Sequence, residues 1–271
     1  MSRPTFHPAA RGADDSPSDR PRFAPAPGAA AQSGMLRAQT IMELRMLRRN
    51  GEQVGLTLIA PLLLLLFFNL PLLYSLGGRR IDFVAPGIIA LSVMSASFTG
   101  LAIGTGFERK YGVLKRLGAT ALPRGILILG KTSAVLLLEI LQVVLVAVVA
   151  LALGWHPHGN PLSAALLVLL GTAALGGLGL LLAGCVRAEV TLAAANLAWL
   201  VLLFCGGIAV PLSKFPSGLA DVLRFLPSAA LSDGLHQVLH NGHAFPVRPV
   251  LTLVAWAALA LPAGARWFRW D

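Results

Sequence analysis

Six apolar runs, each long enough to cross the hydrocarbon core of a bilayer as a helix, decide what this sequence can fold into. Such a helix needs ~20 mainly apolar residues. Only 13% of the residues are charged and the mean hydropathy is +0.73, whereas roughly a quarter are charged in an ordinary soluble domain. Because a soluble chain could not cover this much apolar surface, we expect an all-α, polytopic membrane protein. The predicted spans are residues 55–76, 83–105, 133–153, 162–184, 190–212 and 249–265.

Two different segments precede the first run. Residues 1–34 are polar and rich in Pro, Ala, Ser and Gly, which predicts a disordered cytoplasmic tail. Residues 35–52 predict a basic amphipathic helix that lies along the inner membrane interface. A positive anchor without a lying helix is the alternative. The apolar face would hold Leu36, Ile41, Leu44 and Leu47, and the basic face Arg37, Arg45, Arg48 and Arg49.

The distribution of Lys and Arg predicts the orientation. If the N-terminus is cytoplasmic, that side carries 17 of the 22 Lys and Arg residues, as expected for cytoplasmic loops. We therefore expect a cell-membrane protein with an even number of spans and both termini in the cytoplasm. The net charge of +10 does not indicate nucleic-acid binding, because the basic residues lie in short loops between apolar runs. Cys185 and Cys205 lie in or beside apolar runs and indicate no disulfide framework.

Polar and small residues inside the runs leave several interpretations open. Glu139 and Gln142, one helical turn apart, either line a translocation path or act in proton transfer, or they make interhelical hydrogen bonds. Gly100 and Gly104, and the glycine-rich residues 171–179, predict close packing of helices.

Residues 125–132 read GILILGKT and match the P-loop pattern. A P-loop needs a preceding strand and a loop that wraps phosphates, but here the middle residues are Ile-Leu-Ile-Leu and a spanning run follows. We therefore expect no ATP site and no other cofactor on this chain, and we expect Lys131 to extend to the inner head groups. No catalytic motif of an intramembrane enzyme is present, so we do not expect an enzyme.

Residues 211–242, between the fifth and sixth runs, predict two short helices, each preceded by proline, that lie at or dip into the outer leaflet. His236, His240 and His243 in this segment have a spacing that one helical face could use for a metal. Because no acidic or cysteine ligand lies nearby and Asn241-Gly242 would end the helix, we expect no metal site.

Residues 107–124 form the longest and most charged cytoplasmic connection between spans. Tyr111, Leu114 and Leu117 would form a narrow apolar stripe, Gly118 a helix stop and Pro123 the start of the next helix. Two interpretations remain: the segment docks a protein partner, or its positive charge only sets the topology. The basic residues beside the stripe are Arg109, Lys110, Lys115 and Arg116.

The order of these elements resembles the permease subunit of ABC-2 type exporters, in the daunorubicin-exporter-like branch. The resemblance covers about residues 35–271, and its most specific strings are FERKYGVLKRLGAT at 107–120 and the run from Phe215-Pro216 to Leu226-Pro227. This chain has Thr120-Ala121-Leu122-Pro123, whereas family members often have proline sooner after the threonine.

The resemblance implies a subunit that forms a homodimer or a heterodimer with a related permease. It also implies a separate ABC ATPase that supplies ATP and Mg, membrane lipid as the surroundings, and export of a hydrophobic or amphipathic compound such as a drug, antibiotic or lipid-like molecule. By matching position, the resemblance assigns ATPase coupling to Glu108, Arg109, Tyr111, Gly112, Leu114, Lys115, Arg116 and Leu117.

Two alternatives need no ATPase. A secondary transporter or channel would favour several charges at membrane depth or an inverted repeat, and the sequence offers one glutamate and no obvious repeat. A membrane scaffold would use the same loop to bind another partner.

Overall fold

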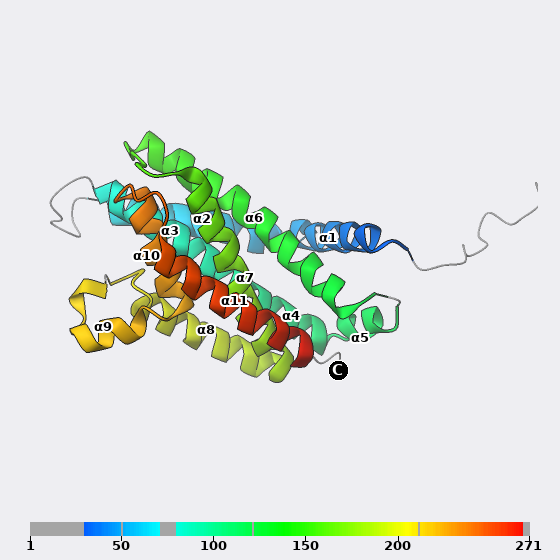
Figure 1. Cartoon of the computed structure of the whole chain (residues 1–271). Helices are drawn as coiled ribbons and strands as arrows, with labels where there is room; N and C mark the ends of the chain where they lie inside the picture. Colours follow the sequence, from blue (N-terminus) through cyan, green and yellow to red (C-terminus); the bar gives the residue numbers. More distant parts are fainter. Residues whose placement is uncertain (1–29, 50, 71–79, 121, 211, 268–271) are drawn as a thin grey trace, which may run out of the picture. The chain divides into compact units, whose positions relative to one another are not determined.

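The computed structural model describes residues 30–49, 51–70, 80–120, 122–210 and 212–267. All regular structure in these residues is helical (Figure 1). The elements are α1 (Gln32–Arg49), α2 (Gly51–Asn69), α3 (Arg80–Val93), the π-helix η2 (Met94–Gly100), α4 (Leu101–Lys110), α5 (Val113–Gly118), α6 (Arg124–Ala152), α7 (Pro161–Cys185), α8 (Ala188–Cys205), the 3-10 turn η3 (Leu212–Lys214), α9 (Ser217–Leu223), α10 (Pro227–Leu239) and α11 (Val247–Trp267).

Five helical segments of the described chain are long and apolar enough to cross a membrane, and the number is six if the bent pair α1 and α2 is counted as one span. The pair turns through 73° between Gln32–Arg49 and Val54–Asn69. The second span is one continuous helix, Arg80–Lys110, built from α3, η2 and α4. The predicted all-α fold with six spans is therefore confirmed as five to six apolar helices. The predicted tail 1–34 lies outside the described residues up to residue 29.

Several predicted boundaries are wrong. Helix α1 begins at Gln32, inside the predicted tail, and the second span is Arg80–Lys110 and not 83–105. Two further errors have a clear local cause. The third span begins at Arg124 and not at 133, because Pro123 has an extended backbone (φ −64°, ψ 143°) from which the helix starts. The fifth span ends at Cys205 and not at 212, because Gly207 has φ +70°, a left-handed conformation that ends the helix and favours glycine. Hydropathy alone did not find either end, since apolar residues continue beyond both.

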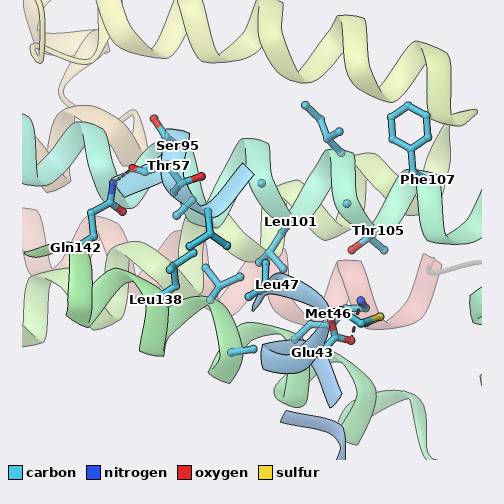
Figure 2. A pocket seen from close by; sticks show the side chains of 18 of the residues that line it. Glu43, Met46, Leu47, Thr57, Ser95, Leu101, Thr105, Phe107, Leu138 and Gln142 are labelled. Carbon is cyan, nitrogen blue, oxygen red and sulfur yellow. Dashed lines mark hydrogen bonds and ion pairs between the residues drawn. The ribbon is translucent and has the colours of Figure 1, made fainter. Parts of the chain in front are cut away.

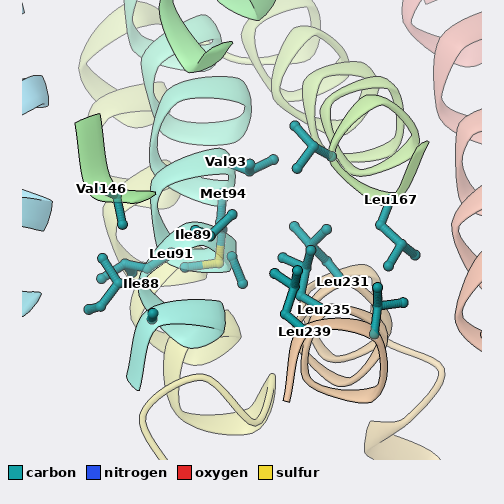
Figure 3. Close-up of a cluster of buried hydrophobic side chains, with 14 of the residues drawn as sticks. Ile88, Ile89, Leu91, Val93, Met94, Val146, Leu167, Leu231, Leu235 and Leu239 are labelled. Atoms are coloured by element: carbon teal, nitrogen blue, oxygen red, sulfur yellow. The ribbon is translucent and has the colours of Figure 1, made fainter. Parts of the chain in front are cut away.

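The main core lies where α3, η2, α7 and α10 meet (Figure 3). Met94, Leu167, Leu231 and Leu235 are fully buried there. Helix α7 also packs closely on its neighbours through glycine, since a Cβ added at Gly179 would lie 2.5 Å from the carbonyl oxygen of Phe98. The predicted close packing at 171–179 is thus formed between α7 and the second span.

Helix α1 packs on α6 through polar side chains. Its buried residues are Gln39 and Glu43, and a Cβ added at Gly130 of α6 would lie 2.4 Å from Cγ of Gln39. The sequence predicted an apolar face instead. Leu36, Leu44 and Leu47 are only half-buried, Ile41 is exposed, and the predicted basic face, Arg37, Arg45, Arg48 and Arg49, is exposed.

The two predicted short helices before the last span are present as α9 and α10. Pro216 precedes α9, and Pro227 is the first residue of α10, where its missing N–H leaves no hydrogen bond unmade. Helix α10 contacts α3, α7 and α11, and ten of its thirteen residues are buried. It is therefore part of the core and does not lie on the surface.

Candidate functional site

A short helix, α5, projects from the corner between α4 and α6 (Figure 1). Gly112 allows the sharp turn because its φ is +70°. Leu114 on the inner face is fully buried and packs with Leu127, Ile128 and Leu180 from α6 and α7, while Leu117 covers the same cluster. This apolar anchor fixes α5 against two spans.

The other face of α5 is exposed. Tyr111, just before the helix, has 69% of its surface exposed, and the side chains of Lys115 and Arg116 also face outward. An anchored helix with an exposed aromatic ring and two cations is suited to binding another protein.

The three charged residues before Tyr111 instead make contacts within the chain. Arg109 donates hydrogen bonds to the carbonyl oxygens of Gly184, at 2.9 Å, and Val186. Lys110 pairs with Glu189 at 2.5 Å. These contacts join the end of α4 to the α7–α8 turn. Among the proposed coupling residues, Glu108 and Arg109 therefore hold the chain together, whereas Tyr111, Lys115 and Arg116 are free to meet a partner.

Lys131 of α6 lies at the centre of a buried charged cluster. Its ammonium is 2.9 Å from Glu43 of α1 and 2.5 Å from Glu108 of α4, and its side chain is 3% exposed. Gln39 donates to Oε1 of Glu43 at 2.8 Å. The prediction that Lys131 extends to the head groups is wrong, because two carboxylates inside the protein satisfy its charge. The role of Glu43 could not be predicted from the sequence, because its only local signal is its i+4 spacing from Gln39.

A cavity of about 640 Å³ lies between α1, α2, η2, α4 and α6 (Figure 2). The charged cluster of Glu43, Glu108 and Lys131 belongs to its wall, and so do Gln142, Thr57 and Ser95 at a distance from that cluster. Between these two polar parts the wall is mainly leucine and other apolar side chains. The leucines labelled in Figure 2 are Leu47, Leu101 and Leu138.

Gln142 and Glu139 occupy different places in the structure. Gln142 lines the cavity and donates through Nε2 to the carbonyl oxygen of Thr57 at 2.7 Å, while its Oε1 has no partner in the described chain. Glu139 is fully buried, does not line the cavity, and meets the hydroxyl of Thr172 on α7. The structure thus places Gln142 in the cavity wall and Glu139 in an interhelical contact.

Gly100 and Gly104 also line the cavity. A Cβ added at Gly104 would meet no atom within 4 Å, and one at Gly100 would meet only Ser95 of the same helical segment. Within one copy of the chain, neither glycine lies at the helix contact that the sequence predicted, and both instead leave space in the cavity wall.

The P-loop pattern and the three histidines do not form the sites that their spacing suggests. Residues 125–132 are helical throughout, so they form no phosphate-binding loop. His236 is partly buried between Phe83 and Ser232, with a ring nitrogen near each carbonyl oxygen (3.0 and 2.7 Å). Burial lowers the pKa of its imidazole. In the described residues no three His, Cys, Asp or Glu side chains are placed to hold a metal.

Comparison with known protein families gives a match. The family model described as ABC-2 family transporter protein matches residues 78–266, more than half of the chain. The match runs from α3 to α11 and so includes α5 and most of the cavity wall. No curated protein matches the chain.

Proposed function

Because the chain belongs to the ABC-2 transporter family, we propose that it is the membrane permease subunit of an exporter driven by a separate ABC ATPase. The family is a component of membrane transport and is not itself catalytic. In the proposed complex, ATP and Mg bind the ATPase chain, and this chain supplies the path across the membrane.

The observation that supports this proposal most is the construction of α5. Its inner face is fixed by Leu114 in the cluster with α6 and α7, and its outer face offers Tyr111, Lys115 and Arg116. A partner that moved α5 would move both spans, because a buried leucine in a close-packed cluster transmits displacement. We therefore place the ATPase contact on the outer face of α5.

The Lys131 cluster extends the same connection. Glu108 lies in the last turn of the second span, just before α5. Its ion pair with Lys131 connects it to α6, and Lys131 also pairs with Glu43 of α1. Movement at α5 would thus reach α1, α4 and α6 together. This path supports switching between inward-facing and outward-facing states driven by the ATPase.

We further propose that α5 and both termini are cytoplasmic in the cell membrane, as the distribution of Lys and Arg favours. We propose a dimer, formed with a second copy or a related permease. Helix α8 supports this proposal, because only 17% of its apolar stretch is buried within one copy of the chain, which leaves an apolar face for a second subunit. A hydrophobic or amphipathic cargo, such as a drug, antibiotic or lipid-like compound, suits the apolar cavity wall.

Co-purification tests the ATPase contact. We expect the tagged chain, extracted from its native membranes in mild detergent, to carry an ATP-hydrolysing subunit identified by mass spectrometry. The double substitution Lys115→Glu and Arg116→Glu should reduce the recovered ATPase at least about tenfold, because like charges would replace complementary ones at the interface.

The matched control is Lys214→Glu with Arg224→Glu, which reverses two exposed cations on either side of α9. This control double variant should leave the amount of recovered ATPase unchanged. Equal loss of the ATPase from both double variants, or recovery unaffected by reversal in α5, would remove α5 from the interface. Recovery of no ATPase from the folded chain would contradict the proposed function itself.

A further inference from the structure

The cavity beside the Lys131 cluster has the features of a ligand site within one copy of the chain. Its volume of about 640 Å³ falls within the range of ~300–1,000 Å³ typical of small-molecule sites. Its wall is mainly apolar, with polar groups at separate places. Ligand sites have this composition because apolar area supplies affinity and a few polar groups set orientation.

The charge of the wall selects the kind of ligand. The charged lining residues are Glu43, Glu108 and Lys131. Two carboxyl groups face one ammonium, so acidic side chains outnumber basic ones among the described lining residues. A cation entering the cavity would find carboxylate acceptors there, whereas an anion would meet only an ammonium that is already paired.

Two further groups of the wall lack a partner. Oε1 of Gln142 and Oγ1 of Thr105 are buried and make no hydrogen bond in the described chain, and both residues line the cavity. Gln142 is 1% exposed and Thr105 2%. An unpaired buried polar atom costs about 1–3 kcal/mol, and a ligand with a hydrogen-bond donor would satisfy the amide oxygen.

We propose that this cavity binds an amphiphile with an apolar body and a protonated amine, with the amine at the carboxylates of Glu43 and Glu108. Leu101 and Leu138 then contact the apolar body, and Oε1 of Gln142 accepts from a donor at its other end. This inference rests on the proposed function, since it names the class of cargo that such a permease would take.

Direct binding to the full-length chain in nanodiscs of zwitterionic lipid tests the site without any ATPase. The probes are three undecyl chains that carry a dansyl fluorophore at one end and differ at the other, which bears an amine, an alcohol or a carboxylate. An alkylamine is protonated at neutral pH, as lysine is. After subtraction of the signal from empty nanodiscs, the amine should bind saturably and at least about tenfold more tightly than the carboxylate.

Two substitutions locate the site. Glu43→Gln should weaken amine binding about tenfold and leave alcohol binding unchanged, because it removes one negative charge while Glu108 still pairs with Lys131. Gly104→Leu should weaken binding of all three probes, because its side chain would enter the space that the glycine leaves open.

Matched controls lie outside the cavity. Glu189→Gln removes an exposed acid that pairs with Lys110, and Gly125→Leu adds the same side chain at a glycine of α6 that has open space around it. Neither residue lines the cavity, and both variants should bind the amine as the unchanged chain does. Thermal unfolding of every variant establishes that it is folded.

Three results would overturn the inference. The first is equal binding of amine, alcohol and carboxylate by the unchanged chain, which needs no variant. The second is amine binding that survives Gly104→Leu in a folded protein. The third is a phospholipid retained in native mass spectra, absent from the Gly104→Leu variant and not displaced by the amine. Each of these leaves ATPase co-purification intact, so failure of the site is distinguishable from failure of the proposed function.

Discussion

Lys131 is stable in its buried position only because two carboxylates surround it. Burial of a single charge in an apolar interior is strongly unfavourable, and a partner compensates only when it lies within contact distance. Glu43 and Glu108, at 2.9 and 2.5 Å, meet that condition. The three residues come from three helices, so the stability of the cluster and the positions of those helices depend on one another.

Removal of the ammonium should destabilise the chain. Lys131→Met leaves two buried carboxylates facing each other, and loss of one partner from a buried ion pair costs about 3–5 kcal/mol. We expect a clear fall in the thermal unfolding midpoint in detergent. Lys110→Met, which removes a cation from the exposed pair with Glu189, should change the midpoint little. Equal midpoints for the two variants would contradict a structural role for the cluster.

Glu139 is either an interhelical contact or a residue that takes part in transport, and substitution distinguishes the two. It lies 15 residues beyond Arg124, about 22 Å along α6 at ~1.5 Å per residue. The single hydroxyl proton of Thr172 has two acceptors nearby, Glu139 and the carbonyl oxygen of Val168. Both contacts form at once if the proton is shared between the two oxygens or if the carboxyl of Glu139 carries its own proton.

Glu139→Gln should therefore preserve both the unfolding midpoint and ATP-driven transport in proteoliposomes, since an amide also supplies a donor to Thr172. Glu139→Ala should lower the midpoint by creating a cavity and leaving Thr172 without this contact. Loss of transport in a stable Glu139→Gln protein would instead assign the residue to proton transfer.

His236 makes stability depend on pH. Burial lowers its pKa below the ordinary value of 6.5, so the folded chain resists protonation that the unfolded chain accepts. The unfolded state then binds more protons as the pH falls below about 6.5, and stability is lost in that range. We expect the unfolding midpoint to fall between pH ~7.5 and ~5.5, and His236→Asn to flatten this change.

His240, one turn further on and exposed, provides the comparison for that measurement. His240→Asn should keep the pH dependence of the unchanged chain. If His240→Asn flattens the curve and His236→Asn does not, the buried imidazole is not its source.

Helix α7 and the second span pack closely because Gly179 has no side chain at their contact. A Cβ at Gly179 would lie 2.5 Å from the backbone oxygen of Phe98 in η2, an atom that cannot move without the helix. Gly179→Ala should therefore destabilise the chain by about 1–3 kcal/mol through overpacking. Thermal unfolding measures the change.

Gly104→Ala is the matched substitution, since the added methyl meets nothing within 4 Å. It should be neutral or slightly stabilising, because alanine forms helix better than glycine. The packing argument fails if both alanine variants unfold at the same temperature.

The elements themselves could largely be predicted from the sequence, because apolar length determines whether a helix can cross a bilayer. The ends could not, since Pro123 and Gly207 act through backbone conformation inside a run that hydropathy does not divide. The exposed face of α5 follows from its charge pattern, with Tyr111, Lys115 and Arg116 outward. The partners of Lys131 do not, because they come from helices far apart in sequence and depend on how those helices pack.

In the proposed complex, force from the ATPase enters this chain through α5. Helix α5 is joined to α6 and α7 by Leu114, and the Lys131 cluster joins the preceding span to α1 and α6. A partner bound at one end of the described chain would thus act on four of its helices. The exposed apolar faces of α6 and α8 are left for lipid or for a second copy.

Photocrosslinking from the outer face of α5 tests this claim most directly. With benzoylphenylalanine in place of Tyr111, 69% exposed beside α5, irradiation of native membranes should join the chain covalently to an ATP-binding subunit. The same residue in place of Phe225, which is 62% exposed next to α9, should not. An ATPase crosslinked from position 111 alone would support entry of force through α5. An ATPase crosslinked only from position 225 would contradict it. So would a complex that hydrolyses ATP but gives no crosslink from either position.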